Sequence, residues 1–144
     1  MKILNYTLVL LFAFGMLSCS SSSSSDKEAP SVVFTSPTIP TTITSGQTVT
    51  FTGVVSDNKE LKSITFSDLT GSATKTVSDF ITDFNEKLDK AKPSSTSVLD
   101  KDTYNVSFSI ETLAGAPAAT YTLTCTVIDS SDNPTNVTFY ITVE

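Results

Sequence analysis

Apolar and polar residues alternate along most of the chain from residue 31 onward. In the segment 48–55, Val49, Phe51 and Val55 fall on one side of an extended chain, with threonines between them. A period of two residues is typical of a strand that is buried on one side only. Apolar stripes recur in the segments 31–34, 64–66, 106–110, 121–127 and 137–143. We therefore expect six or seven short antiparallel strands with threonine-rich outer faces, which predicts an all-β sandwich. The polar residues 57–59 predict a turn between the second and third strands.

Residues from about 77 to 91 follow a helical period instead. Apolar side chains recur there at spacings of three and four residues, at Val77, Phe80, Ile81, Phe84 and Leu88. This spacing places them on one face of a helix, and Pro93 marks its end. The expected fold is an all-β antiparallel sandwich of about seven strands with one helical insertion over about 77–91. Two roles remain open for the insertion: it covers an edge of the sandwich with Phe80 and Phe84 packed inward, or it presents these rings to a partner.

The N-terminal segment has the pattern of an export signal. Lys2 is followed by an apolar run over residues 3–17, which is shorter than the ~20 residues of a membrane-spanning helix. A charged start, an apolar run and a small residue are typical of a secretory signal peptide. Residues 16–19 end in Cys19 and resemble the lipobox of bacterial lipoproteins. The resemblance implies that the Cys19 thiol receives a lipid and that Cys19 becomes the first residue of the mature chain.

Six serines follow, Ser20–Ser25, and they favour a lipoprotein over an ordinary signal peptide with a coincidental cysteine. A polar run of this kind behaves as a flexible tether. The expected organisation is a signal peptide over 1–18, a lipidated Cys19 with a serine-rich tether over 19–29, and the sandwich over 30–144. Because serine rather than aspartate follows the cysteine, the resemblance implies the outer membrane, with exposure on the cell surface left open.

Composition argues against several classes of function. Fifteen acidic residues stand against nine basic ones, and the formal net charge is −6. Nucleic-acid binding needs a basic surface, so we expect no nucleic-acid partner. Histidine and tryptophan are absent, which removes the usual general base and transition-metal ligand and the strongest ring for stacking on sugars. Cys125 lies in register with Leu123 and Val127, so we expect a buried thiol with a raised pKa rather than a reactive one.

Three segments, Ala29–Pro37, Val54–Ile64 and Ala119–Asn133, share a pattern with a known type of domain. The first resembles the opening strand of bacterial immunoglobulin-like domains of the cadherin and PKD type. The second resembles their second-to-third strand turn, and the third their penultimate strand with the loop after it. The resemblance implies an immunoglobulin-like sandwich, of a kind found as domains of unknown function on bacterial lipoproteins. The tryptophan-containing motif of the PKD type is absent, and the helical insertion belongs to neither type.

The topology of such a sandwich brings acidic residues together at one end. The first strand starts there, the second ends there, and the penultimate strand turns into the last. Three acidic pairs should therefore gather at this end: Asp26 and Glu28, Asp57 and Glu60, and Asp129 and Asp132. Ca²⁺ takes six to eight oxygen ligands, so Asp57, Asp129 and Asp132 are a candidate Ca²⁺ site, although overall we expect no cofactor. The interpretation we favour is that these residues only form turns, because Asp and Asn favour turns.

Three functions are compatible with these features. The one we favour is a non-catalytic interaction or scaffolding module, held at the bacterial envelope membrane by its lipid, with an unidentified envelope protein or glycan as partner. The second is a glycan-binding surface lipoprotein, for which Tyr104 and Tyr140 would point outward. The third is a small hydrolase with paired carboxylates from Asp79, Asp83 or Glu86, although lysines are interleaved with them as on a solvated face. The residues proposed for a partner surface are Phe80, Phe84, Tyr104 and Tyr140.

Overall fold

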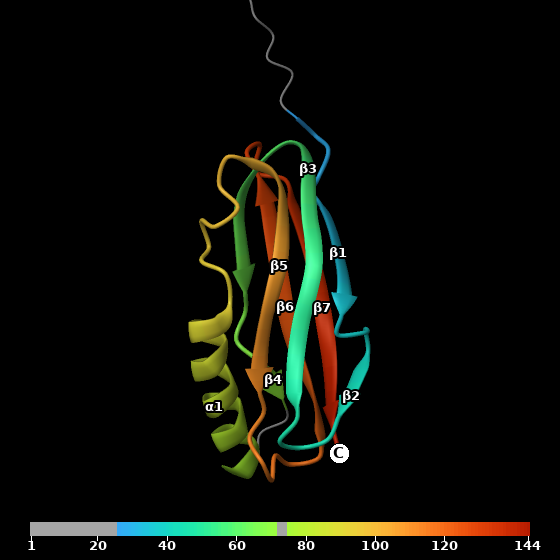
Figure 1. Cartoon of the computed structure of the whole chain (residues 1–144), viewed down its shortest axis with the longest axis vertical. Helices are drawn as coiled ribbons and strands as arrows, with labels where there is room; N and C mark the ends of the chain where they lie inside the picture. The colour runs from blue at the N-terminus through green and yellow to red at the C-terminus, as the bar shows by residue number, and fades with distance from the viewer. Residues whose placement is uncertain (1–25, 72–74) are drawn as a thin grey trace, which may run out of the picture.

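The alternating segments form strands, and the segment of helical period forms a helix. The computed structural model describes residues 26–71 and 75–144, which fold into an immunoglobulin-like β-sandwich with one helical insertion (Figure 1). In this part of the chain the elements are β1 (Ser31–Ser36), β2 (Thr41–Ile43), β3 (Thr48–Phe66), β4 (Thr70–Gly71), α1 (Lys75–Ala91), β5 (Lys101–Glu111), β6 (Ala119–Asp129) and β7 (Pro134–Val143). Buried and half-buried positions alternate regularly along β6, as expected for a strand with one face in the core. The predicted fold class is confirmed.

The two layers of the sandwich share the long strand β3. Its first part, up to Ser56, pairs antiparallel with β5 and with β1. From Leu61 onward it pairs antiparallel with β6, which in turn pairs with β7. Residues 57–60 carry the chain from one layer into the other and reverse its direction (Figure 1). The predicted turn at 57–59 therefore coincides with this reversal, although extended pairing continues through it and joins both parts into one strand of 19 residues.

One strand pair is parallel, contrary to the expectation of a wholly antiparallel sandwich. β2 lies beside β7, with Thr41 opposite Ile141 and Ile43 opposite Val143. β1 belongs to the layer of β3 and β5, whereas β2 forms the edge of the layer of β6 and β7. The chain keeps its direction as it crosses between the layers (Figure 1), so β2 runs the same way as β7.

Aromatic rings from both layers form the centre of the core. Phe51 stacks on Phe108 with ring centroids 4.8 Å apart and meets Phe139 edge-on at 5.2 Å. Ring pairs of this kind contribute about 0.5–1.5 kcal/mol beyond the area that they bury. Cys125 belongs to the same core, in register with Leu123 as predicted, and burial raises the pKa of its thiol to about 12.

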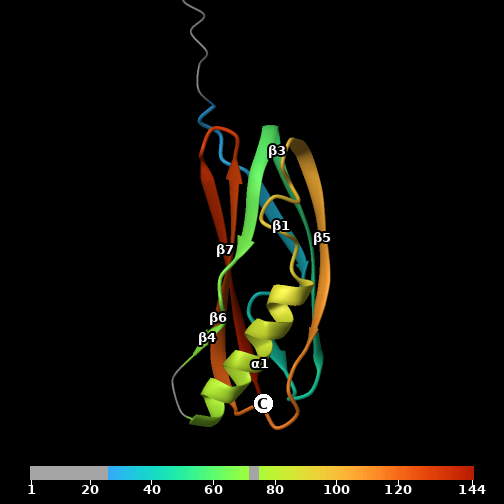
Figure 2. The same ribbon diagram turned by 90° about the vertical axis from the view of Figure 1, so that its left-hand side faces the viewer.

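The helix α1 packs its apolar face against the strands. Phe80, Phe84 and Leu88 are each no more than 1% exposed. The Phe80 ring lies 4.7 Å from the ring of Tyr121 on β6. Figure 2 shows the helix lying across the open side of the sandwich, between β5 and β4. The insertion thus covers an edge of the sandwich, and its observed start at Lys75 lies two residues before the predicted one.

The two ends of the sandwich differ in character. At one end β1 and β7 begin, β3 reverses and β6 ends; we call this end the acidic pole and define it as residues 26–30, 56–61 and 129–133. The C-terminal residue Glu144 lies at the opposite end (Figure 1). Among the described residues, no helix is both long enough and apolar enough to cross a membrane.

Candidate functional site

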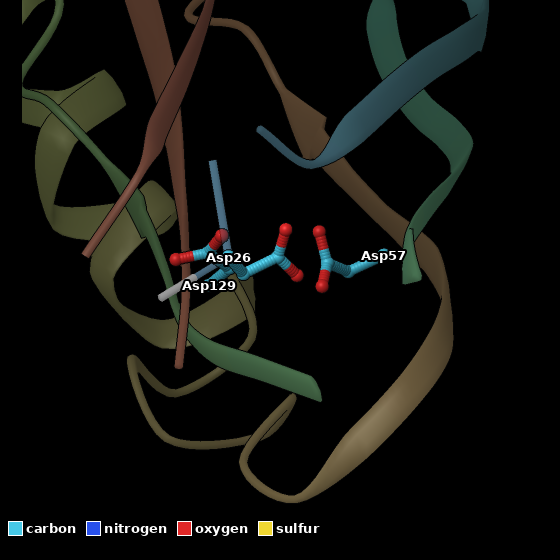
Figure 3. Close-up of side chains that lie close together, drawn as sticks. All are labelled: Asp26, Asp57 and Asp129. Atoms are coloured by element: carbon cyan, nitrogen blue, oxygen red, sulfur yellow. The ribbon is translucent and has the colours of Figure 1, made fainter. Parts of the chain in front are cut away.

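Three aspartates meet at the acidic pole, each from a different segment. Asp26 precedes β1, Asp57 lies in the reversal of β3, and Asp129 ends β6. One carboxylate oxygen from each lies within 4.8 Å of the other two, and Figure 3 shows the three side chains close together. Carboxylate oxygens are ligands that Ca²⁺ prefers. Within residues 26–71 and 75–144, these three form a group of carboxylates that could hold a divalent cation.

Asp129 is fixed by the loop that follows it. Its side chain is fully buried, and Oδ1 accepts the backbone N–H groups of Ser131 at 2.8 Å and Asn133 at 2.7 Å. Oδ2 accepts a hydrogen bond from the Asn133 amide Nδ2 at 2.7 Å. An aspartate that bonds to backbone a few residues on forms a tight turn, so the β6–β7 loop itself positions the carboxylate.

Asp26 is held in place by its neighbours at the pole. Its backbone carbonyl accepts a hydrogen bond from Asn133 Nδ2 at 3.0 Å, and its Oδ1 accepts the Glu28 N–H at 3.0 Å. The bond from Glu28 lowers the pKa of the Asp26 carboxyl, burial opposes this, and the Asn58 amide and the Lys59 ammonium lower it further. The carboxylate is thus favoured in its charged form.

These contacts extend the folded part of the chain beyond its predicted boundary. The sequence assigns residues 26–29 to the tether, but the Asn133 amide donates to the carbonyls of both Asp26 and Glu28. Asn58 Nδ2 also donates to Glu28 Oε2 at 3.2 Å. The segment therefore lies against the pole and brings an aspartate into it.

Two oxygens in this cluster lack a hydrogen-bond partner. Among the described residues, Asp26 Oδ2 and Asp57 Oδ2 are buried and accept no hydrogen bond. The other Asp57 oxygen accepts the Lys59 backbone N–H at 2.9 Å. The Lys59 ammonium lies 4.0 Å from Asp26 Oδ2, which is outside hydrogen-bonding distance. Buried carboxylate oxygens normally have a hydrogen-bond partner, so these two are unsatisfied acceptors within the cluster.

Asp132 does not join the cluster, which corrects the predicted set of Asp57, Asp129 and Asp132. Its side chain points to solvent and forms an ion pair with Lys62. Its backbone has a φ of 67°, a conformation for which Asp and Asn are the preferred residues after glycine. Asp132 is therefore a turn residue. Asp26, and not Asp132, is the third aspartate of the cluster.

The predicted partner surface of four aromatic residues is wrong in three positions. Phe80 and Phe84 are buried under the helix, so they are not available to a partner. Tyr104 shares the inward register of Val106 and packs partly against the core, while the Lys101 ammonium lies 4.9 Å from its ring centroid. Tyr140 alone of the four stands outward, with 48% of its surface exposed.

Tyr140 lies on a sheet face lined by threonines. We call the outer side of β6 and β7 the threonine face; its residues are Thr120, Thr122, Thr124, Thr138, Tyr140 and Thr142. Thr122 lies directly opposite Tyr140 across the two strands. The hydroxyls of Thr124 and Thr138 are 3.2 Å apart, and those of Thr120 and Thr142 are 3.1 Å apart. Cross-strand threonine pairs of this kind stabilise a sheet.

The remaining candidate residues lie on the helix surface or outside the described residues. Asp83 forms an ion pair with Lys87 at 2.8 Å, and Asp79 and Glu86 are exposed. This pattern matches a solvated helix face rather than a pair of catalytic carboxylates. Cys19 and the predicted signal peptide fall outside the part of the chain that the structure describes.

Comparisons with known proteins find similar structures but no similar sequence. No protein-family model and no curated protein sequence matches the chain. The BIgI domain of the beta protein from S. agalactiae, solved bound to CEACAM1, is 24% identical at a TM-score of 0.41, and the match covers 79% of this chain and 97% of that one. The GspB Siglec domain is 12% identical at a TM-score of 0.48, covering 83% and 59%.

Titin domains Z1Z2, solved in complex with telethonin, are also similar. They are 18% identical at a TM-score of 0.44, and the match covers 83% of this chain and 49% of that one. Similarity at this level concerns the fold alone. The immunoglobulin-like character of the sandwich rests on its own strand pairing.

Proposed function

We propose that this chain is a non-catalytic binding module of the bacterial envelope. A lipid on Cys19 holds it at the outer membrane, and the threonine face binds an envelope protein. The observation that supports this proposal most directly is the exposure of Tyr140 within that face. Tyrosine is enriched among the residues that dominate protein interfaces, because it offers a large rigid ring and a hydroxyl.

The position of the threonine face relative to the proposed anchor supports the same function. Seven residue steps separate Cys19 from Asp26, so the acidic pole can stand no more than about 25 Å from the lipidated residue. The strands run from this pole to the far end (Figure 1). The threonine face therefore lies along the side of the molecule, where a neighbouring protein can reach it.

A glycan is the second candidate partner, and the exposure of Tyr140 is again the relevant observation. Sugar binding would need several outward rings, but Tyr104 packs against the core and leaves Tyr140 without its predicted companion. The threonine hydroxyls also bond to one another in pairs. These features favour a protein as the partner, because aromatic and apolar side chains of a protein can pack against the Tyr140 ring and the threonine methyl groups.

The variant Tyr140→Thr tests the proposed surface. Threonine continues the pattern of the face and suits a strand, so the fold should persist. We expect recovery of partner proteins, quantified by mass spectrometry after purification from envelope membranes, to fall roughly tenfold or more. A glycan array run in parallel should remain blank for both proteins.

Val54→Thr is the matched control. Val54 is also an outward residue with substantial exposure, but it lies on β3 in the other layer. Its replacement should leave partner recovery unchanged. Equal recovery with Tyr140→Thr and the parent protein would contradict the proposed surface, and a Tyr140-dependent signal on the glycan array would favour a sugar partner instead.

A further inference from the structure

We propose that Asp26, Asp57 and Asp129 form a Ca²⁺ site that fastens the N-terminal segment 26–29 to the sandwich. The site is independent of the threonine face and of any partner. One of its ligands precedes the first strand, so the ion connects the start of the folded chain to the β3 reversal and to the end of β6.

The distances fit the coordination sphere of Ca²⁺. Oxygen ligands lie about 2.3–2.6 Å from this ion, so two ligands of one ion are at most roughly 5 Å apart. The three carboxylate oxygens lie within 4.8 Å of one another. A single Ca²⁺ can therefore touch all three without a large movement. Water can complete the six to eight ligands that the ion takes.

The unpaired oxygens point to a ligand rather than to a mere cluster of acidic turns. The Asp26 side chain is only 7% exposed, and its Oδ2 accepts no hydrogen bond. The same holds for the buried Oδ2 of Asp57. A buried carboxylate oxygen without a partner is unfavourable, and neighbouring like charges add repulsion. A divalent cation between these residues would remove both penalties.

Asp129 retains capacity for a metal ion. A carboxylate has about four acceptor positions, and Asp129 receives hydrogen bonds from Ser131 and from both nitrogens of Asn133. These bonds hold its orientation and leave one position free. Outer-shell donors of this kind are what orients a metal-binding carboxylate.

Lys59 is the competing cation within the protein. Its ammonium lies 4.0 Å from Asp26 Oδ2, and its side chain is half exposed. A single partly solvated ammonium at this distance compensates three carboxylates poorly. We expect Lys59 to turn outward when Ca²⁺ binds, and Lys59→Gln to bind Ca²⁺ more tightly than the parent protein.

The test uses the chain from residue 19 onward with Cys19→Ser, which retains every described residue. Titration calorimetry with CaCl₂ measures the affinity, and thermal unfolding of the EDTA-treated protein measures the effect on stability. At about a hundredfold excess of Ca²⁺ over Kd, we expect the Tm to rise by roughly 5–10 °C. Ca²⁺ should also slow cleavage after Lys27 by endoproteinase Lys-C, because Lys27 adjoins Asp26.

Two asparagine variants separate the site from its surroundings. Asp57→Asn keeps the side-chain shape and removes one of three repelling charges. We expect its Tm without Ca²⁺ to be equal or higher and its Ca²⁺ affinity to fall at least roughly tenfold. Asp132→Asn is the matched control, since Asn tolerates the same backbone conformation and Asp132 faces Lys62; it should bind Ca²⁺ like the parent. The proposal is overturned if Ca²⁺ gives neither heat nor a Tm shift, if both variants lose affinity equally, or if NaCl at equal ionic strength gives the same shift.

Discussion

Cys125 shows how the core determines the chemistry of a single residue. Its side chain is fully buried among apolar neighbours on β6, and burial raises the pKa of the thiol to about 12 from 9.0. In the unfolded chain the thiol ionises first, so alkaline pH favours unfolding. The stabilising contribution of the neutral thiol is complete below the unfolded pKa and is lost as the pH rises towards the folded pKa.

The variant Cys125→Val removes this titration while keeping a small apolar side chain. Urea unfolding of both proteins at about pH 8 and about pH 10.5 gives their free energies of unfolding. We expect the parent protein to lose more stability between the two pH values than the variant. Burial also raises the pKa of Tyr121. Its effect on the pH dependence of stability is the same in both proteins and cancels in the comparison. The same pH dependence in both would show that Cys125 ionises freely in the fold.

For single residues, the sequence predicts which side chains point into the core better than it predicts which residues join the aspartate cluster. Alternation correctly places Cys125 and Tyr140, because the side-chain direction in a strand depends only on register. The outward prediction for Tyr104 is wrong, since this ring shares the inward register of Val106. The sequence places Asp26 near the pole but not in the cluster, because its position depends on a hydrogen bond with Asn133 that no local pattern reveals.

The helix α1 is the element in which the sandwich departs most from a simple sheet pair. Its apolar face closes the open side between β5 and β4 (Figure 2). Its polar face reaches back to the strands: Lys87 Nζ donates to the backbone carbonyl of Glu111 at 3.0 Å. The helix is therefore part of the folding unit, because its buried rings complete the core.

Truncation of one buried ring measures this contribution. We expect Phe84→Ala to lower the free energy of unfolding by about 3–5 kcal/mol, the usual cost of removing a buried phenylalanine side chain. Glu86→Ala, on the exposed side of the same helix, should change it by less than about 0.5 kcal/mol. Urea unfolding followed by circular dichroism gives both values. If Phe84→Ala left the free energy of unfolding unchanged, the helix would not be an integral part of the core.

The sequence predicts which segments form strands and which forms a helix. It does not predict which strands pair with one another. The helix and the strand stripes follow local periods, so their positions are largely correct. The parallel pairing of β2 with β7 depends on where the chain crosses between layers, which neither segment encodes by itself. The same applies to β3, whose two parts pair in different layers on either side of residues 57–60.

The molecule as a whole has one end that leads to the proposed anchor and one that points away. Asp26 lies at the acidic pole and Glu144 at the opposite end (Figure 1). With a lipid on Cys19, the pole would face the membrane and the far end would face outward. The Ca²⁺ site would then lie at the base of the domain, where it stiffens the connection to the anchor.

Metabolic labelling with a fatty-acid analogue tests the anchor. We expect the full chain to become labelled in a bacterial host and Cys19→Ala to lose the label completely, because Cys19 is the proposed acceptor. Cys125→Ala is the matched control and should keep the label, since its thiol is buried. Label that persists in Cys19→Ala would refute the lipoprotein assignment.

Photo-crosslinking in living cells tests whether the threonine face binds a protein at the envelope. A benzophenone amino acid replaces Tyr140 in one strain and Val54, on the other layer, in a second. Irradiation should yield a discrete crosslinked protein from position 140 and none from position 54. No adduct from position 140, or equal adducts from both positions, would contradict the proposed function.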